Sequence, residues 1–204
     1  MGFSQFKSLG DVAKLFPFRL EKRDFITMQK FSPALLVVEN IRLVLETDLH
    51  RSSEAARCET LIFPILQEVW RHYADVLKLW NHAPLQVDDL LGGVPDYLVA
   101  KKSEFGPMMM GMPIVVAIEA KQDDFVAGWG QCVAEMFAAQ KYNASEAAVY
   151  GIVSNGETWE FSKLEGSVLT QNVLPFGIAD LDKLFGALAF VMEECKKQVE
   201  LISS

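Results

Sequence analysis

The chain has 204 residues, half of them hydrophobic, and carries 27 acidic against 19 basic residues for a net charge of −8. This length and apolar content predict one domain with a sizeable core, and the excess of acid disfavours a protein that coats nucleic acid with a broad basic surface. Three widely spaced cysteines without a CxxC pair, no signal peptide and no apolar run long enough for a membrane span predict a cytoplasmic protein.

Helical spacing of apolar residues dominates the first part of the chain. The pattern predicts a short helix over residues 8–16 and an extended piece over 22–29. A helix is predicted over 33–47, where Pro33 suits the first turn and Ser32 is a candidate cap. These residues belong to the stretch 1–52, which is expected to form an N-terminal helical extension.

A second helix is predicted from Ser53 to Tyr73, because Ser53 offers a cap and good helix formers follow it. Pro64 lies inside this helix and predicts a bend. Strand patterns follow from residue 84 onward, and Asn155-Gly156 is a hairpin signal. The predicted strands cover residues 84–91, 94–101, 112–121, 147–154, 158–163 and 166–173, and further helices are predicted over 123–142 and 178–201.

The order of these elements predicts an α/β fold with a mixed central β-sheet flanked by helices. The third and fourth strands are joined through a helix, so they are expected to be parallel with a right-handed crossover, whereas the first three form an antiparallel meander. The single domain 1–204 then divides into the extension 1–52, a core at 53–163, and a C-terminal strand and helix at 164–204.

Charged residues at the end of one apolar strand are the clearest functional signal. In the segment PIVVAIEAK at residues 113–121, Glu119 and Lys121 point to the same face because a strand alternates with period two. Placing them in an apolar strand is costly unless they are used. Asp96 supplies a second carboxylate at a turn before the preceding strand. This arrangement suits a metal-dependent phosphodiesterase, although Asp96 as a turn residue and a plain Glu119–Lys121 ion pair are the structural alternatives.

Pro95-Asp96, followed after 22 residues by Glu119-Ala120-Lys121, resembles the motif of the PD-(D/E)XK superfamily, whose members share the restriction-endonuclease-like fold. The resemblance implies a Mg²⁺ (or Mn²⁺) ion bound by Asp96, Glu119 and the Ala120 carbonyl. It also implies that Lys121 orients the attacking water or stabilises the developing charge.

Two further residues extend the resemblance. Glu59 lies in the helix before the sheet, where many members carry an extra acid, and would hold a metal-bound water or a second ion. Gln131 follows in the next helix and would position Lys121 or a phosphate. With Gln131 in this helix and Trp159 near the hairpin, the chain is similar to one branch of the superfamily, the nuclease domains at the N-termini of type I restriction subunits. The three histidines, His50, His72 and His82, show no ligand spacing.

The resulting hypothesis is a Mg²⁺-dependent endo- or exonuclease that hydrolyses phosphodiester bonds of nucleic acid, with DNA the expected partner. The alternative is a catalytically inactive or regulatory member of the fold that binds a partner without turnover. Either protein would be compatible with a homodimer, formed through the apolar faces of the helices at 33–47 and 178–201, or with a partner subunit.

Overall fold

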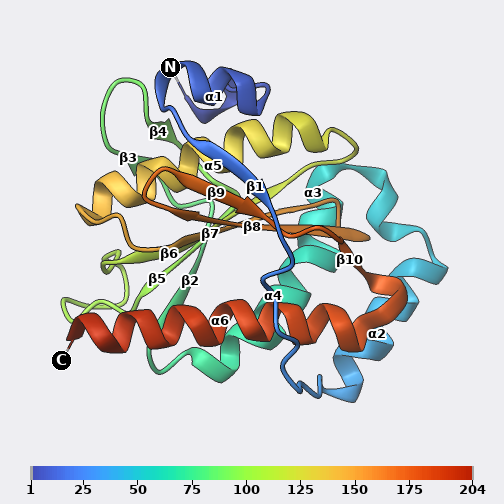
Figure 1. Cartoon of the computed structure of the whole chain (residues 1–204). Helices are drawn as coiled ribbons and strands as arrows, with labels where there is room; N and C mark the ends of the chain where they lie inside the picture. Colours follow the sequence, from blue (N-terminus) through green and yellow to red (C-terminus); the bar gives the residue numbers. More distant parts are fainter. Residues whose placement is uncertain (1, 204) are drawn as a thin grey trace.

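A mixed β-sheet with helices on both faces forms the centre of the computed structural model, which describes residues 2–203 (Figure 1). The strands are β1 (Arg19–Lys22), β2 (Leu77–Asn81), β3 (Leu85–Gln86), β4 (Gly92–Gly93), β5 (Tyr97–Lys101), β6 (Ile114–Ala120), β7 (Val149–Ser154), β8 (Thr158–Glu165), β9 (Val168–Gln171) and β10 (Phe176–Gly177). The helices are α1 (Leu9–Leu15), α2 (Leu35–Glu46), α3 (Glu54–Arg57), α4 (Phe63–Trp70), α5 (Phe125–Asn143) and α6 (Leu181–Ser203).

The strand order in the main sheet is β1-β9-β8-β7-β6-β5-β2, with β10 paired to β8. The strands β2, β5 and β6 form an antiparallel meander, and α5 carries the chain across to β7, which pairs parallel to β6. A parallel pair needs such a crossover, and its helix covers one face of the sheet. The predicted α/β architecture with a mixed sheet is therefore confirmed, and it is compatible with the restriction-endonuclease-like fold.

The first strand of the meander is β2 rather than the predicted strand at 84–91, so that prediction was wrong. Only Leu85–Gln86 from that stretch is extended, in a small separate sheet with Gly92–Gly93. Asp88 explains the difference, because its Oδ1 accepts hydrogen bonds from the backbone N–H groups of Leu90 and Leu91, both at 2.8 Å. A carboxylate that bonds to its own following backbone favours a turn over a strand.

Two helix starts differ in how they are capped. Ser53 caps α3 as predicted, since its Oγ accepts from Ala56 N at 3.0 Å. Ser32 does not cap α2; the N-cap position is Ala34, whose N–H donates to Glu68 Oε1 at 2.8 Å. The single helix predicted over 53–73 is divided instead: a π-helical turn at Cys58–Ile62 joins α3 to α4, and Pro64 lies in the first turn of α4.

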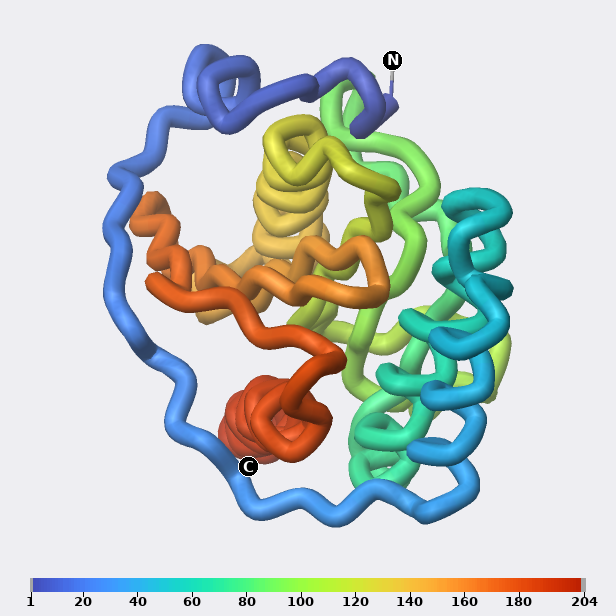
Figure 2. Tube along the Cα trace, turned by 90° about the vertical axis from the view of Figure 1, so that its right-hand side faces the viewer, coloured from blue at the N-terminus to red at the C-terminus, as the bar shows by residue number. Residues whose placement is uncertain are grey.

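Two hydrophobic cores lie on the two faces of the sheet. α1 and α5 cover one face, and α2, α4 and α6 lie on the other (Figures 1 and 2). The central part of the apolar face of α6, which includes Leu184 and Leu188, is buried against the sheet. It is therefore unavailable for the dimer interface that the sequence suggested, whereas α2 keeps exposed leucines. In the part of the chain described, none of the helices combines the length and hydropathy that crossing a bilayer requires.

An N-terminal strap, residues 17–34, connects the two layers around the outside of the sheet. Figure 2 shows it running from the α1 side to α2 along one edge of the molecule. Within it, β1 adds a parallel edge strand to β9, and Gln29 N donates to Gly186 O at 3.3 Å on α6. A Cβ at position 186 would lie 2.7 Å from Gln29 O, so glycine permits this close approach.

Candidate functional site

The antiparallel meander of β5 and β6 holds the two carboxylates of the motif, Asp96 and Glu119, side by side. β5 and β6 pair antiparallel with Tyr97 opposite Ile118, so Asp96, just before β5, lies beside the end of β6. Asp96 Oδ2 accepts a hydrogen bond from Ala120 N at 2.8 Å. Asp96 thus fixes the end of β6 as well as presenting a carboxylate beside Glu119.

Glu119 and Lys121 form a close ion pair that faces α5. Glu119 is only 4% exposed, and its Oε1 lies 2.6 Å from Lys121 Nζ. Burial and the charge of Asp96 raise the pKa of Glu119 to about 7, against the opposing effect of Lys121. Burial lowers the pKa of Lys121, but the Glu119 carboxylate more than offsets this, so the net shift is upward and Lys121 stays protonated.

Sequence reasoning missed Glu135, a third carboxyl group of this cluster. It lies in α5, is 1% exposed and shares a hydrogen bond with Glu119. Burial and the charge of Glu119 raise the pKa of Glu135 well above the usual range of a glutamate. Its Oε2 has no hydrogen-bond partner within residues 2–203. The available signal was a lone acid in the otherwise apolar segment at 132–139.

The helix α5 approaches the motif closely through Gly128. A Cβ there would lie 3.0 Å from Lys121 Cγ and 2.7 Å from Val153 Cγ1, so a side chain would push the helix away. Gln131 and Glu135 follow one and two turns later, on the same side of the helix. Gln131 is half-buried, and none of the hydrogen bonds found among the described residues involves its side chain. Its predicted contact with Lys121 stays a prediction.

A pocket of about 420 Å³ opens on the other side of Asp96. Glu59 lines it together with Asp96, as do Glu54, which the sequence did not single out, and His82, for which the sequence showed no ligand spacing. His82 Nδ1 lies 3.7 Å from Asp96 Oδ1. The remaining lining residues are Ala55, Cys58, Phe63, Asn81 and Tyr97, while Glu119 and Lys121 do not line the pocket.

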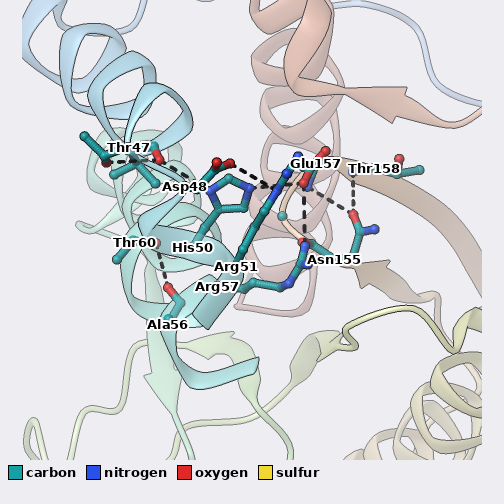
Figure 3. A network of polar contacts seen from close by, with 12 residues as sticks. Thr47, Asp48, His50, Arg51, Ala56, Arg57, Thr60, Asn155, Glu157 and Thr158 are labelled. Carbon is teal, nitrogen blue, oxygen red and sulfur yellow. Dashed lines mark hydrogen bonds and ion pairs between the residues drawn. The ribbon is translucent and has the colours of Figure 1, made fainter. Parts of the chain in front are cut away.

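A polar network fixes α3, which carries Glu54, beside the loop between β7 and β8 (Figure 3). Arg57 is almost fully buried and donates through Nη1 to Asn155 O at 3.1 Å, with Glu157 Oε1 at 3.7 Å. Buried His50 places Nε2 3.1 Å from the same Glu157 oxygen. The strand before this loop also holds the motif, because Lys121 N donates to Ser154 O at 2.9 Å. The network therefore sets one wall of the pocket relative to the motif.

The charges of the cluster formed by Asp96, Glu119, Glu135 and Lys121 determine whether a divalent cation suits it. Asp96, Glu119 and Glu135 present three carboxyl groups to one ammonium, and burial of that excess acid is what raises the pKa values of the two glutamates. Hard oxygen donors and surplus negative charge suit Mg²⁺ or Mn²⁺. In residues 2–203, however, no three His, Cys, Asp or Glu side chains are already placed to hold a metal ion. Glu119 Oε1 is instead held by Lys121 Nζ, at 2.6 Å.

No protein-family profile and no curated protein matches the sequence. Among solved structures, the chain is similar to one described as a DrdV–DNA complex determined by cryo-electron microscopy, with a TM-score of 0.44 and 13% sequence identity. The similarity covers 78% of this chain and 14% of that one, so the chain spans about a seventh of the length of the structure it resembles.

Proposed function

We propose that this protein is a divalent-cation-dependent nuclease that hydrolyses phosphodiester bonds of nucleic acid. The observation that carries the proposal is the juxtaposition of Asp96, Glu119 and Lys121 at the adjoining ends of β5 and β6, with an excess of buried acid around one ammonium. A structural ion pair alone does not need the third carboxyl group of Glu135 behind it. The excess is relieved when a cation binds.

Asp96 and Glu119 are the residues that would hold Mg²⁺ or Mn²⁺, with the Ala120 carbonyl as a further oxygen donor. When bound, the ion supplies charge neutralisation at the phosphoryl oxygens and lowers the pKa of a bound water. Glu135 shares a hydrogen bond with Glu119 and so fixes the orientation of that carboxyl group from the α5 side. The hydrogen bond from Ala120 N to Asp96 fixes the second carboxylate in the same way.

Lys121 acts as a cationic donor in this proposal rather than as a base. Its raised pKa keeps the ammonium charged at neutral pH, and once freed from Glu119 the Nζ donates to a phosphoryl oxygen or orients the attacking water. Glu59 is on the pocket side of Asp96, where it would hold a water molecule or a second ion. Gln131 would contact a phosphate or Lys121 from α5.

The Glu119–Lys121 ion pair favours a second candidate, a protein of the same fold that binds nucleic acid without cutting it. At 2.6 Å the ammonium occupies the carboxylate oxygen that a metal would use. A cation that cannot displace Lys121 would leave the cluster as a structural element. The two candidates differ in whether a divalent cation binds and whether hydrolysis follows.

Cleavage of labelled DNA and RNA with Mg²⁺ or Mn²⁺ tests the proposal directly. Lys121→Ala and Asp96→Asn are expected to lower the rate by about three orders of magnitude, as removal of a group that stabilises transition-state charge does. Lys163→Ala is the matched control, because Lys163 also pairs with a glutamate two residues away on a strand, at 2.7 Å. Activity that survives both site substitutions would reject the assignment.

Calorimetric titration with Mn²⁺ separates the two candidates. The nuclease proposal expects binding to the wild type that is lost in Glu119→Gln. A wild-type protein that binds nucleic acid but neither Mn²⁺ nor a cleavable substrate is instead the non-cutting protein of the second candidate.

A further inference from the structure

The pocket beside Asp96 has a composition that the metal cluster does not explain. It holds about 420 Å³, within the range of small-ligand sites, and Asp96 and Glu59 are the members that it shares with the proposed metal site. We propose that it receives one unpaired nucleobase of the substrate, adjacent to the phosphate that is cut. This inference rests on the proposed function and adds a substrate class to it, namely single-stranded nucleic acid.

Aromatic rings form part of the pocket wall. The rings of Phe63 and Tyr97 are stacked with centroids 6.2 Å apart and 14° between their planes. His82 lies against Tyr97 at 6.0 Å and is 60% exposed, so its ring is accessible from the pocket. Tyr97 itself is buried, so the exposed His82 ring is the one on which a base of single-stranded nucleic acid would stack, whatever the sequence.

The polar residues of the pocket favour a base over a phosphate. The exposed side chains of Glu54 and Glu59 are acceptors when ionised, and they repel an anionic phosphate. They suit the exocyclic amines of adenine, cytosine and guanine, whereas thymine and uracil have none. Asn81, also exposed, offers both a donor and an acceptor. The pocket therefore favours amine-bearing bases.

His82 connects this pocket to the motif through its backbone. Its N–H donates to Asp96 O at 2.9 Å, and its φ of +47° is a left-handed conformation that is unusual for a residue other than glycine. The hydrogen bond holds the end of β2 beside Asp96. A base that stacks on His82 is consequently placed next to the carboxylate that would hold the cation, so base binding positions the phosphate.

A base inside a duplex can enter such a pocket only after it has unpaired and unstacked, which costs free energy. A base in a single strand is already unpaired. The expected substrate order is therefore single strand over the matching duplex, and oligo(dA) or oligo(dC) over oligo(dT). Both orders follow from the pocket and not from the cation site.

Fluorescence anisotropy with a labelled single-stranded oligonucleotide in Ca²⁺ measures binding, and cleavage in Mg²⁺ gives kcat and KM. His82→Ala and Asn81→Ala are expected to weaken single-strand binding and raise KM, about tenfold for loss of a stacking ring, while kcat changes less. Lys121→Ala should instead lower kcat by about three orders of magnitude. His72→Ala is the control, because His72 is exposed and contacts Phe31 outside the pocket.

His82→Gly guards against misfolding as the cause, because it removes the ring while relieving the left-handed backbone. It should bind as weakly as His82→Ala with a melting temperature no lower than that of the wild type. If the wild type cuts and the pocket variants behave like His72→Ala, or if duplex and single strand are cut equally, the base pocket is refuted and the nuclease stands. Binding that depends on His82 without any cleavage refutes the nuclease alone. If the wild type shows neither cleavage nor binding that depends on His82, both the nuclease and the base pocket are refuted.

Discussion

Replacing Glu119 with glutamine should stabilise the metal-free protein above neutral pH, although it removes a proposed metal ligand. Because a tenfold change in proton affinity corresponds to about 1.4 kcal/mol, the rise in the pKa of Glu119 from 4.5 to about 7 means that ionising this carboxyl group costs the fold about 3 kcal/mol. Glutamine has nearly the same shape and carries no charge, so it avoids that cost.

The sign of the pH dependence follows from the raised pKa. Below about pH 4.5 Glu119 is protonated in both the folded and unfolded states, and the variant and the wild type should be equally stable. Between about pH 4.5 and pH 7 the unfolded chain releases this proton while the folded protein keeps it, so wild-type stability falls as the pH rises. Above this window the full advantage of Glu119→Gln, up to about 3 kcal/mol, should be present.

Urea unfolding in EDTA at pH 4.5 and at pH 8 measures this difference. Glu165→Gln is the matched control, because Glu165 also pairs with a lysine two residues away on a strand but is 56% exposed. Adding Mn²⁺ at pH 8 should then raise the stability of the wild type selectively, by about 2.7 kcal/mol at a hundredfold excess over the Kd. A variant that is no more stable than the wild type at pH 8, or a gap that is the same at both pH values, would refute the reasoning.

Two further predictions concern packing and buried charge. Gly130→Ala should lower the free energy of unfolding by roughly 2 kcal/mol, because its Cβ would lie 2.7 Å from the backbone oxygen of Phe6, whereas Gly10→Ala in α1 meets no backbone and should gain about 0.5 kcal/mol. Urea unfolding of both variants checks this, and equal effects would contradict it. Arg57→Ala should cost about 2 kcal/mol, since it breaks the buried contacts of α3 with the β7–β8 loop, while the exposed Arg51→Ala should cost about 0.5 kcal/mol or less. Thermal unfolding measures this contrast, and an Arg57→Ala protein as stable as Arg51→Ala would show that the network contributes nothing.

The parts of the site that lie on neighbouring strands could be predicted from the sequence. Period-two alternation places Glu119 and Lys121 on one face, and antiparallel pairing of consecutive strands brings Asp96 beside them. The runs at 114–120 and 149–154 were recognisable as buried strands because they are almost continuously apolar, and every residue in them is buried. These relations are local, so they need no knowledge of how the layers pack.

Features that depend on packing between distant segments were not predictable. Glu135 reaches Glu119 only because Gly128 lets α5 approach β6. The periodicity of a helix indicates which face is buried, but not how closely the helix approaches the sheet. The pocket depends on α3 being held by contacts between Arg57 and Asn155, which are far apart in the chain. The first strand of the meander, β2, was missed because it is five residues long and directly follows a helical pattern.

The N-terminal strap has a consequence for the order in which the fold can be completed. Its strand β1 pairs with β9, so that Arg19 lies opposite Val168. Further along the strap, Gln29 N donates to Gly186 O. During synthesis these early residues leave the ribosome long before either docking surface exists. The segment can therefore dock only after residues 168 and 186 have emerged, and its closure is a non-local event of the kind that slows folding.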